Sequence, residues 1–164
     1  MWSARYVGAL GGFFKGEQVV STEENKAIVR RWLEEGWSKG DLAVADEVID
    51  PGFVVHGAGG QAVPSGPAGV KQLVSAWRTG FPDGRMVVED MLAEGDKVAI
   101  RMAWHGTHTG SFYGYAPTGR HVTVTSIGID RIANGRVVEG WGELDMLGLY
   151  QQIGAMPRPG PRGP

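Results

Sequence analysis

The sequence predicts a single α+β domain in which a curved antiparallel sheet wraps around N-terminal helices and forms a cone with one open mouth. Helical periodicity ends near residue 80, strand-like segments follow to residue 145, and hairpin turns separate these segments. A length of 164 residues suits one domain with its own core. Small-molecule sites favour such concavities, so we expect a ligand-sized pocket inside the cone.

Three helices are expected in the first half of the chain. Ser21 and Glu24 form a capping box in front of apolar residues at helical spacing, which marks the start of the first helix. Pro67 suits the first turn of another helix. The pattern predicts helices over about 22–38, after Asp41 and over about 67–79, with a short strand over 53–56 and a glycine-rich loop over 57–64 between the last two.

Four strand-like segments and a short closing helix fill the second half. The strands are expected at 85–93, 97–105, 121–132 and 136–145, and the helix at 146–153. Glu94-Gly95-Asp96 and Ala133-Asn134-Gly135 read as hairpin turns, because Asn-Gly is the strongest short hairpin signal. A connection rich in Gly, Thr and Tyr, residues 106–120, joins the second strand to the third.

Composition excludes several classes of function. The net charge is -2 without a long basic run, which disfavours nucleic acid and anionic membranes as partners. The absence of cysteine excludes disulfides, thiolate nucleophiles and cysteine zinc sites, and it fits a cytoplasmic protein. No apolar run approaches the ~20 residues of a membrane span. We interpret residues 1–20 as an N-terminal extension rather than a signal peptide, 21–156 as the domain, and 157–164 as a disordered Pro/Gly-rich tail.

The last strand has one acidic and aromatic face. That face carries Val137, Glu139, Trp141, Glu143 and Asp145, while the glycines at 140 and 142 leave space on the opposite face or permit a bulge. Asp145 directly precedes apolar residues, and burial there would raise its pKa toward neutrality, as suits a general acid or base. The alternative role of Asp145 is the N-cap of the closing helix.

The strand over 97–105 has two distinct faces. Arg101, Ala103 and His105 alternate with Val98, Ile100, Met102 and Trp104. We interpret the first set as lining a cavity; alternatively, Arg101 pairs with Glu139 and His105 faces solvent. The second set would then form an apolar patch on the outer face of the sheet, which suggests a homodimer.

Metal and dinucleotide sites are not expected. His105 and His108 have H-x-x-H spacing, but a strand and turn would not bring both imidazoles to one face. The glycine-rich stretch 57–60 opens no helix, so it does not fit a dinucleotide fingerprint. His56, which leaves the first strand, has the surroundings of a surface or partly buried histidine. Trp32, Trp77 and Trp141 are candidates to wall an aromatic-tolerant pocket.

An ordered set of motifs resembles the SnoaL-like polyketide cyclases, also called ester cyclases. The motifs are Phe81-Pro82-Asp83, Val88-Glu89-Asp90, Gly106-Thr107-His108-Thr109-Gly110, Pro117-Thr118-Gly119-Arg120 and Glu139-x-Trp141-x-x-x-Asp145. The resemblance covers about residues 22–156. It implies the cone of the nuclear-transport-factor-2-like fold, in agreement with the order of elements.

The resemblance also implies a chemistry and a set of residues. Characterised members close a ring of an aromatic polyketide by intramolecular aldol condensation without a metal, a Schiff base or an organic cofactor. Asp145 matches their acid/base aspartate on the last long strand, and His56 resembles a histidine found after the second helix. His105 and Arg101 are supporting catalytic candidates, for polarising the carbonyl. Candidates for contact with a hydrophobic substrate are Trp32, Phe53, Trp77, Glu139, Trp141 and Met146.

Two other functions remain open at this point. The same fold hosts epoxide hydrolases, which need paired acids flanking an arginine; Asp145, Glu143, Glu139 and Arg101 are the available candidates, although no Asp-x-Arg pair from a neighbouring strand is evident. The second alternative is a non-catalytic module that binds a small hydrophobic molecule.

Overall fold

The computed structural model describes residues 21–56, 64–157 and 160. The N-terminal extension expected over 1–20, nearly all of the loop expected over 57–64 and most of the tail expected over 157–164 lie outside the described residues. Within the described ranges, no helix has both the length and the apolar character needed to cross a membrane.

The expected helices and strands are all present, with small shifts of their ends. In chain order they are α1 (Thr22–Arg31), η1 (Trp32–Lys39), α2 (Ala43–Val48), β1 (Ile49–His56), α3 (Gly66–Gly80), β2 (Arg85–Glu94), β3 (Lys97–Thr107), β4 (His121–Ala133), β5 (Arg136–Leu144) and α4 (Met146–Ile153). The capping box at Ser21 and Glu24 is confirmed, with both reciprocal hydrogen bonds formed. The helical segment predicted over about 22–38 continues to Lys39, but its second part, η1, is wound as a π-helix, and Gly40 ends it at a φ of 75°.

The five strands form one sheet in the order β1-β5-β4-β3-β2. Strands β2, β3, β4 and β5 are antiparallel neighbours, which confirms the expected meander. The edge strand β1 pairs with β5 in parallel, so the sheet as a whole is mixed. The predicted strand over 53–56 thus belongs to a longer β1, which extends the sheet beside the N-terminal part of β5.

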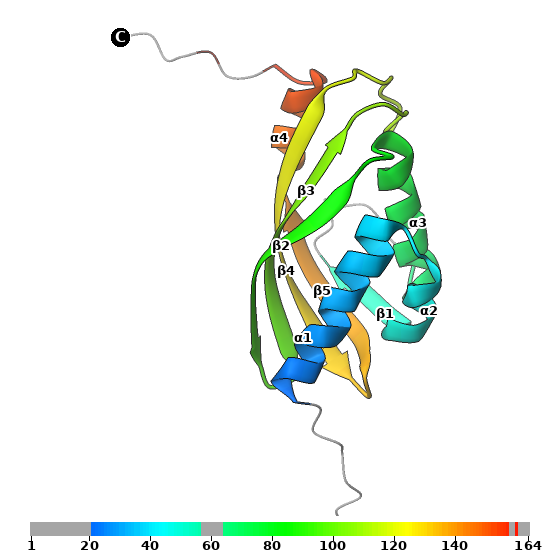
Figure 1. Cartoon of the computed structure of the whole chain (residues 1–164), viewed down its shortest axis with the longest axis vertical. Helices are drawn as coiled ribbons and strands as arrows, with labels where there is room; N and C mark the ends of the chain where they lie inside the picture. The colour runs from blue at the N-terminus through cyan, green and yellow to red at the C-terminus, as the bar shows by residue number, and fades with distance from the viewer. Residues whose placement is uncertain (1–20, 57–63, 158–159, 161–164) are drawn as a thin grey trace, which may run out of the picture.

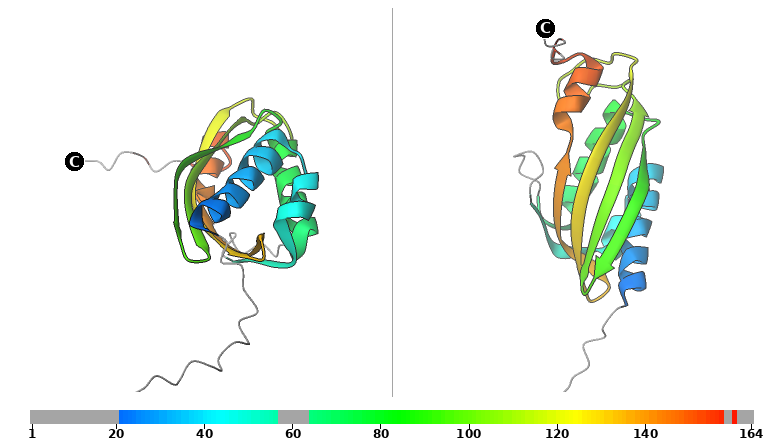
Figure 2. Two further views of the ribbon diagram at one scale, coloured as in Figure 1. Left: turned by 60° about the horizontal axis from the view of Figure 1, so that its bottom comes forward. Right: turned by 90° about the vertical axis from the view of Figure 1, so that its left-hand side faces the viewer.

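The sheet is strongly twisted and curves around the helices (Figures 1 and 2). Helices α1, α2 and α3 cover its concave face, while none of the described helices covers the outer face of β2, β3 and β4 (Figure 2). The closing helix α4 lies at one end of the sheet, beyond the end of β5 (Figure 1). This arrangement confirms the α+β cone.

Two hydrophobic clusters fill the concave side. One joins α1, η1, α2 and α3 to β1 and β3, and it includes Val29, Leu33, Val74 and Ile100. The other lies toward α4 and includes Trp77, Phe81, Trp104, Phe112 and Leu149. A sheet with one uncovered face places its more apolar set of side chains against the helices.

The predicted outer patch on β3 is wrong for this reason. Val98, Ile100 and Trp104 are at most 2% exposed and point into the cone, and Met102 packs against the same core. The alternating set with Arg101 and His105 therefore lies on the outer face rather than lining a cavity. Val98, Ile100, Met102 and Trp104 therefore do not form an outer apolar patch, and they give no support to the predicted homodimer.

His108 organises the connection between β3 and β4. Its side chain is fully buried against Phe81, its Nδ1 lies 3.1 Å from the Thr118 hydroxyl, and burial lowers its pKa. Its backbone N–H donates to the Arg120 carbonyl, and its carbonyl accepts from the N–H groups of Thr118 and Gly119. The second histidine of the H-x-x-H pair is thus a core residue, turned away from the outer face that carries His105.

Candidate active site

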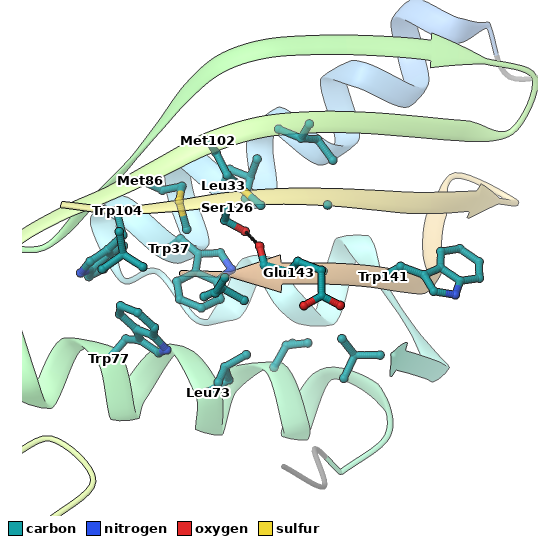
Figure 3. A pocket seen from close by; sticks show the side chains of 18 of the residues that line it. Leu33, Trp37, Leu73, Trp77, Met86, Met102, Trp104, Ser126, Trp141 and Glu143 are labelled. Atoms are coloured by element: carbon teal, nitrogen blue, oxygen red, sulfur yellow. Dashed lines mark hydrogen bonds between the residues drawn. The ribbon is translucent and has the colours of Figure 1, made fainter. Parts of the chain in front are cut away.

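A cavity of about 340 Å³ lies between the concave face of the sheet and the helices (Figure 3). Its lining combines side chains of η1, α3 and α4 with side chains of every strand of the sheet. Most of them are aromatic or aliphatic; they include Trp32, Leu33, Trp37, Phe53, Leu73, Trp77, Met86, Ile100, Met102, Trp104 and Tyr150. The volume and the apolar lining are those of a small-molecule site.

Three tryptophans form a rigid aromatic wall at one end of the cavity. The ring centroids of Trp37, Trp77 and Trp104 lie 5.6–6.4 Å apart, and all three pairs meet edge to face. They come from η1, α3 and β3, and Figure 3 shows them together at the same end of the pocket. Edge-to-face contacts restrict the rotation of each ring, so this wall has a fixed shape.

Asp130 on β4 is an acidic side chain on the mostly apolar inner face of the sheet. It is partly buried, it lines the pocket, and it has no hydrogen bond or ion pair to any described residue. No Lys, Arg or His among the described residues lines the pocket to offset its charge. Burial therefore disfavours the carboxylate and raises the pKa of Asp130 to about 7. A carboxyl group with such a pKa can both accept and donate a proton near neutral pH.

The residue opposite Asp130 explains how the carboxyl group fits. Asp130 is paired across the strands with Gly140 on β5. A Cβ atom at Gly140 would lie 2.9 Å from the Asp130 Oδ1 and 3.2 Å from the Phe53 ring. The space predicted from the glycines of the last strand is therefore present, and Asp130 occupies part of it.

Other polar groups also line the pocket. The Ser126 hydroxyl donates to the Glu143 carbonyl at 2.9 Å, and the exposed Glu143 carboxylate is directed from β5 toward the pocket (Figure 3). Tyr113, from the connection between β3 and β4, and Tyr150 of α4 also line the pocket. The lining of the cavity thus combines mostly apolar side chains with a few polar groups and the Asp130 carboxyl group.

Residues 27–153 match the sequence model of one protein family, the SnoaL-like polyketide cyclases. The chain belongs to this family. The match spans most of the chain and all of the pocket, and it agrees with the resemblance carried by the motifs.

Individual relatives of this chain are distant in sequence. Aklanonic acid methyl ester cyclase DauD of Streptomyces sp. (strain C5) is 29% identical over 142 residues, covering 83% of this chain and 84% of DauD. Its counterpart DnrD of Streptomyces peucetius is 29% identical over 118 residues, covering 71% of this chain and 78% of DnrD. The structure of TsrD from Streptomyces laurentii is similar with a TM-score of 0.75 at 27% identity, covering 83% of this chain and 98% of TsrD.

Asp145 does not line the pocket. It is exposed, it stands at the N-cap of α4, and its Oδ1 accepts a 2.8 Å hydrogen bond from the Gly148 N–H. The capping role weighed from the sequence is thus present. The catalytic role of Asp145 stays a prediction, which a substitution can compare directly with that of Asp130.

His56 and Glu139 meet each other outside the pocket. The His56 Nε2 lies 2.9 Å from one Glu139 oxygen, and the Arg131 Nε donates to the other at 3.0 Å. These contacts lower the pKa of Glu139. The His56 ring also stacks on Trp141 at 5.2 Å. Glu139 therefore pairs with Arg131 rather than with Arg101, and neither His56 nor Glu139 belongs to the pocket lining.

Arg101 and His105 lie on the outer face of β3. Arg101 forms an ion pair with Glu89 of β2, and the His105 Nδ1 lies 3.1 Å from the Thr123 hydroxyl of β4. Their catalytic roles stay predictions. Of the residues expected to contact substrate, Trp32, Phe53, Trp77, Trp141 and Met146 line the pocket, and Glu139 does not. Within the described part of the chain, no three His, Asp or Glu side chains lie close enough together to hold a metal ion.

Asp130 was not among the site residues predicted from the sequence. The signal was present, because Val122, Val124, Ser126, Gly128 and Asp130 share one face of β4, and four of these are buried. An acidic residue that ends such a row is unusual. Ile127 and Ile129 on the opposite face are also apolar, so alternation alone does not say which face is inward.

The unpaired carboxyl group should cost stability in a pH-dependent way. The pKa of Asp130 is about 7 in the folded chain against an ordinary 3.8, so the folded state loses stability as the pH rises from about 4 to above 7. At pH 8 we expect Asp130→Asn to raise the free energy of unfolding by up to about 4 kcal/mol, and near pH 3.5 the gain should vanish. Urea denaturation across this pH range measures the difference.

Asp145→Asn is the matched control, because Asn is as good an N-cap as Asp and the site is exposed. Its free energy of unfolding should stay within about 0.5 kcal/mol of wild type at each pH. An Asp130→Asn protein that is no more stable than wild type at pH 8 would contradict the buried, unpaired state of this carboxyl group.

Proposed function

We propose that this protein closes a ring in a polyketide-like substrate by an aldol-type reaction, with Asp130 as the general acid and base. The observation that carries the proposal is the unpaired carboxyl group inside an apolar cavity. Family membership supports the cyclase class, and the substrate named for DauD and DnrD, aklanonic acid methyl ester, guides the choice of the first compound to assay.

The proposed step moves one proton and forms one bond. The Asp130 carboxylate takes a proton from a carbon beside a carbonyl group, and the resulting enolate carbon bonds to a second carbonyl carbon of the same molecule. The new alkoxide then takes up the proton from Asp130, so the product is an isomer of the substrate. Confinement in the cavity supplies up to ~7–11 kcal/mol of the barrier reduction, and proton transfer adds ~10²–10⁴-fold.

Replacing Asp130 tests the proposal. With aklanonic acid methyl ester as substrate, we expect Asp130→Asn to lower kcat about 10²–10⁴-fold, because the amide cannot exchange the proton. Wild-type kcat/KM should rise with pH through about 7, as the carboxyl group ionises. Chromatography coupled to mass spectrometry measures an isomeric product of unchanged mass.

Asp145→Asn separates the two aspartates. We expect it to keep kcat within about threefold of wild type, since an exposed N-cap is not in the pocket. Full turnover by Asp130→Asn together with loss of turnover by Asp145→Asn would return the catalytic role to Asp145. Variants of His56, Arg101 and His105 in the same assay test the remaining predicted catalytic residues.

The alternatives have less support from the pocket. Epoxide opening by this mechanism requires paired acids and an arginine, and no arginine is among the described residues that line the cavity. A diol product that carries oxygen from labelled water would nevertheless establish that reaction. Tight binding of the ester without turnover, unaffected by Asp130→Asn, would establish a binding module.

We also propose that the protein is a homodimer, through a different apolar surface from the one first considered. Ile129 and Leu92 are 39% and 67% exposed and lie in one row across the outer face, joined by Ala99. Ile127 is 61% exposed beside them. None of the helices in the described part of the chain covers the outer sheet face there (Figure 2). A contiguous apolar surface of this kind is typical of protein interfaces.

Light scattering after size exclusion tests the dimer. We expect a mass of twice 17.6 kDa for wild type and of 17.6 kDa for Ile127→Lys/Ile129→Lys, because burying two lysines would disfavour the interface. Val54→Lys, which alters an exposed apolar residue of β1, is the control and should leave the mass unchanged. A monomeric wild-type protein at high micromolar concentration would contradict the dimer.

A further inference from the structure

Three of the residues next to Asp130 on the inner face of β4 and β5 are glycines. Gly128 of β4 is paired with Gly142 of β5, and Asp130 is paired with Gly140. Because residues two apart on a strand share a face, these four positions form one block of the wall. Three of the four carry no side chain, and all four line the pocket.

Packing explains two of the three glycines. A Cβ at Gly140 would press on the Asp130 carboxyl group at 2.9 Å, and a Cβ at Gly128 would lie 3.3 Å from the Trp141 carbonyl. At Gly142, by contrast, a Cβ would meet no heavy atom within 4 Å. The backbone at Gly142 also does not have the positive φ that favours glycine. Neither packing nor backbone conformation therefore requires glycine at position 142.

A glycine that the fold does not need has a cost. Glycine within a strand loses more backbone entropy on folding than other residues and offers no side chain to pack, at roughly 0.5–1 kcal/mol relative to alanine. The space next to Gly142 is part of the open cavity. The effect of having no side chain at position 142 is therefore to keep that space free. The space adjoins Asp130, the group that the proposed function makes the acid and base.

We infer that Gly142 is a specificity-determining residue that holds open a flat slot beside Asp130 and admits a fused, planar ring system. The peptide planes of Gly128 and Gly142 form one side of the slot, and Leu73 and Trp77 project from α3 on the other side of the pocket (Figure 3). A side chain at position 142 fills the slot, so wide ligands are excluded and a single ring still enters. This inference rests on the proposed function for the identity of the reacting group.

Ligand binding by a graded series of variants tests the slot. The probes are 1-hydroxyanthraquinone, with three fused rings, and phenol, with one; quenching of the pocket tryptophans reports binding. From Gly142→Ala to Gly142→Val to Gly142→Leu we expect a stepwise rise in Kd for the three-ring probe, reaching about tenfold or more at leucine. The Kd for phenol should stay within about threefold of wild type.

Two controls keep the outcomes separate. Thr125→Leu adds the same bulk to the exposed face of β4 and should change neither Kd, and thermal midpoints verify that every variant folds. Equal Kd values for the three-ring probe across the glycine series, or no binding of that probe to wild type, would overturn the slot. Turnover unaffected by Asp130→Asn would instead overturn the proposed catalytic role while leaving the size dependence of binding intact.

Discussion

Asp130 and Gly140 face each other across β4 and β5. The pocket depends on two absences at this pair: a side chain on Gly140 and a partner for the Asp130 carboxyl group. Gly140 lacks the side chain that would press on the carboxyl group, and Asp130 lacks a hydrogen-bonding or charged partner among the described residues. The curved sheet brings this pair beneath the helices, where apolar side chains limit its access to water. A carboxyl group in these surroundings is ready to exchange protons at neutral pH.

The unpaired Asp130 carboxyl group lowers the stability of the folded chain and favours proton exchange. Leaving a carboxylate unpaired in a mostly apolar cavity, between Val98 and Gly140 of the neighbouring strands, costs free energy at neutral pH. The two hydrophobic clusters on either side of the pocket offset that cost without filling the cavity. The edge-to-face tryptophans then keep the wall rigid, so a substrate meets a preformed site rather than one that must be ordered on binding.

The sequence predicted the elements well because the signals were local. The capping box at Ser21, the turn at Asn134-Gly135 and the alternation along the strands each depend on a few neighbouring residues. The inward direction of a strand face is not local. The apolar set with Trp104 points inward because the helices cover only one side of the sheet, and alternation contains no information about that side.

The same limit explains the candidate site. Asp145 stood out because of its motif, although its spacing alone allowed both an N-cap and a catalytic group. In the structure, Asp145 forms the N-cap hydrogen bond. Asp130 did not stand out, because the isoleucines on the outer face of β4 made that strand look apolar on both sides. The contact between Glu139 and His56 depends on the parallel pairing of β1 with β5, and no local pattern indicates that pairing. The contact between Glu139 and Arg131 instead follows from the antiparallel hairpin of β4 and β5.

The most direct measurement is the pKa of Asp130 itself. In protein labelled with carbon-13 at the aspartate carboxyl groups, the resonance that disappears in Asp130→Asn belongs to this residue, and its chemical shift can be followed with pH. The buried, unpaired carboxyl group predicts a midpoint at about 7. A midpoint near the ordinary value of 3.8 would contradict the central claim, because an ordinary surface-like carboxylate could not serve as both acid and base in the pocket.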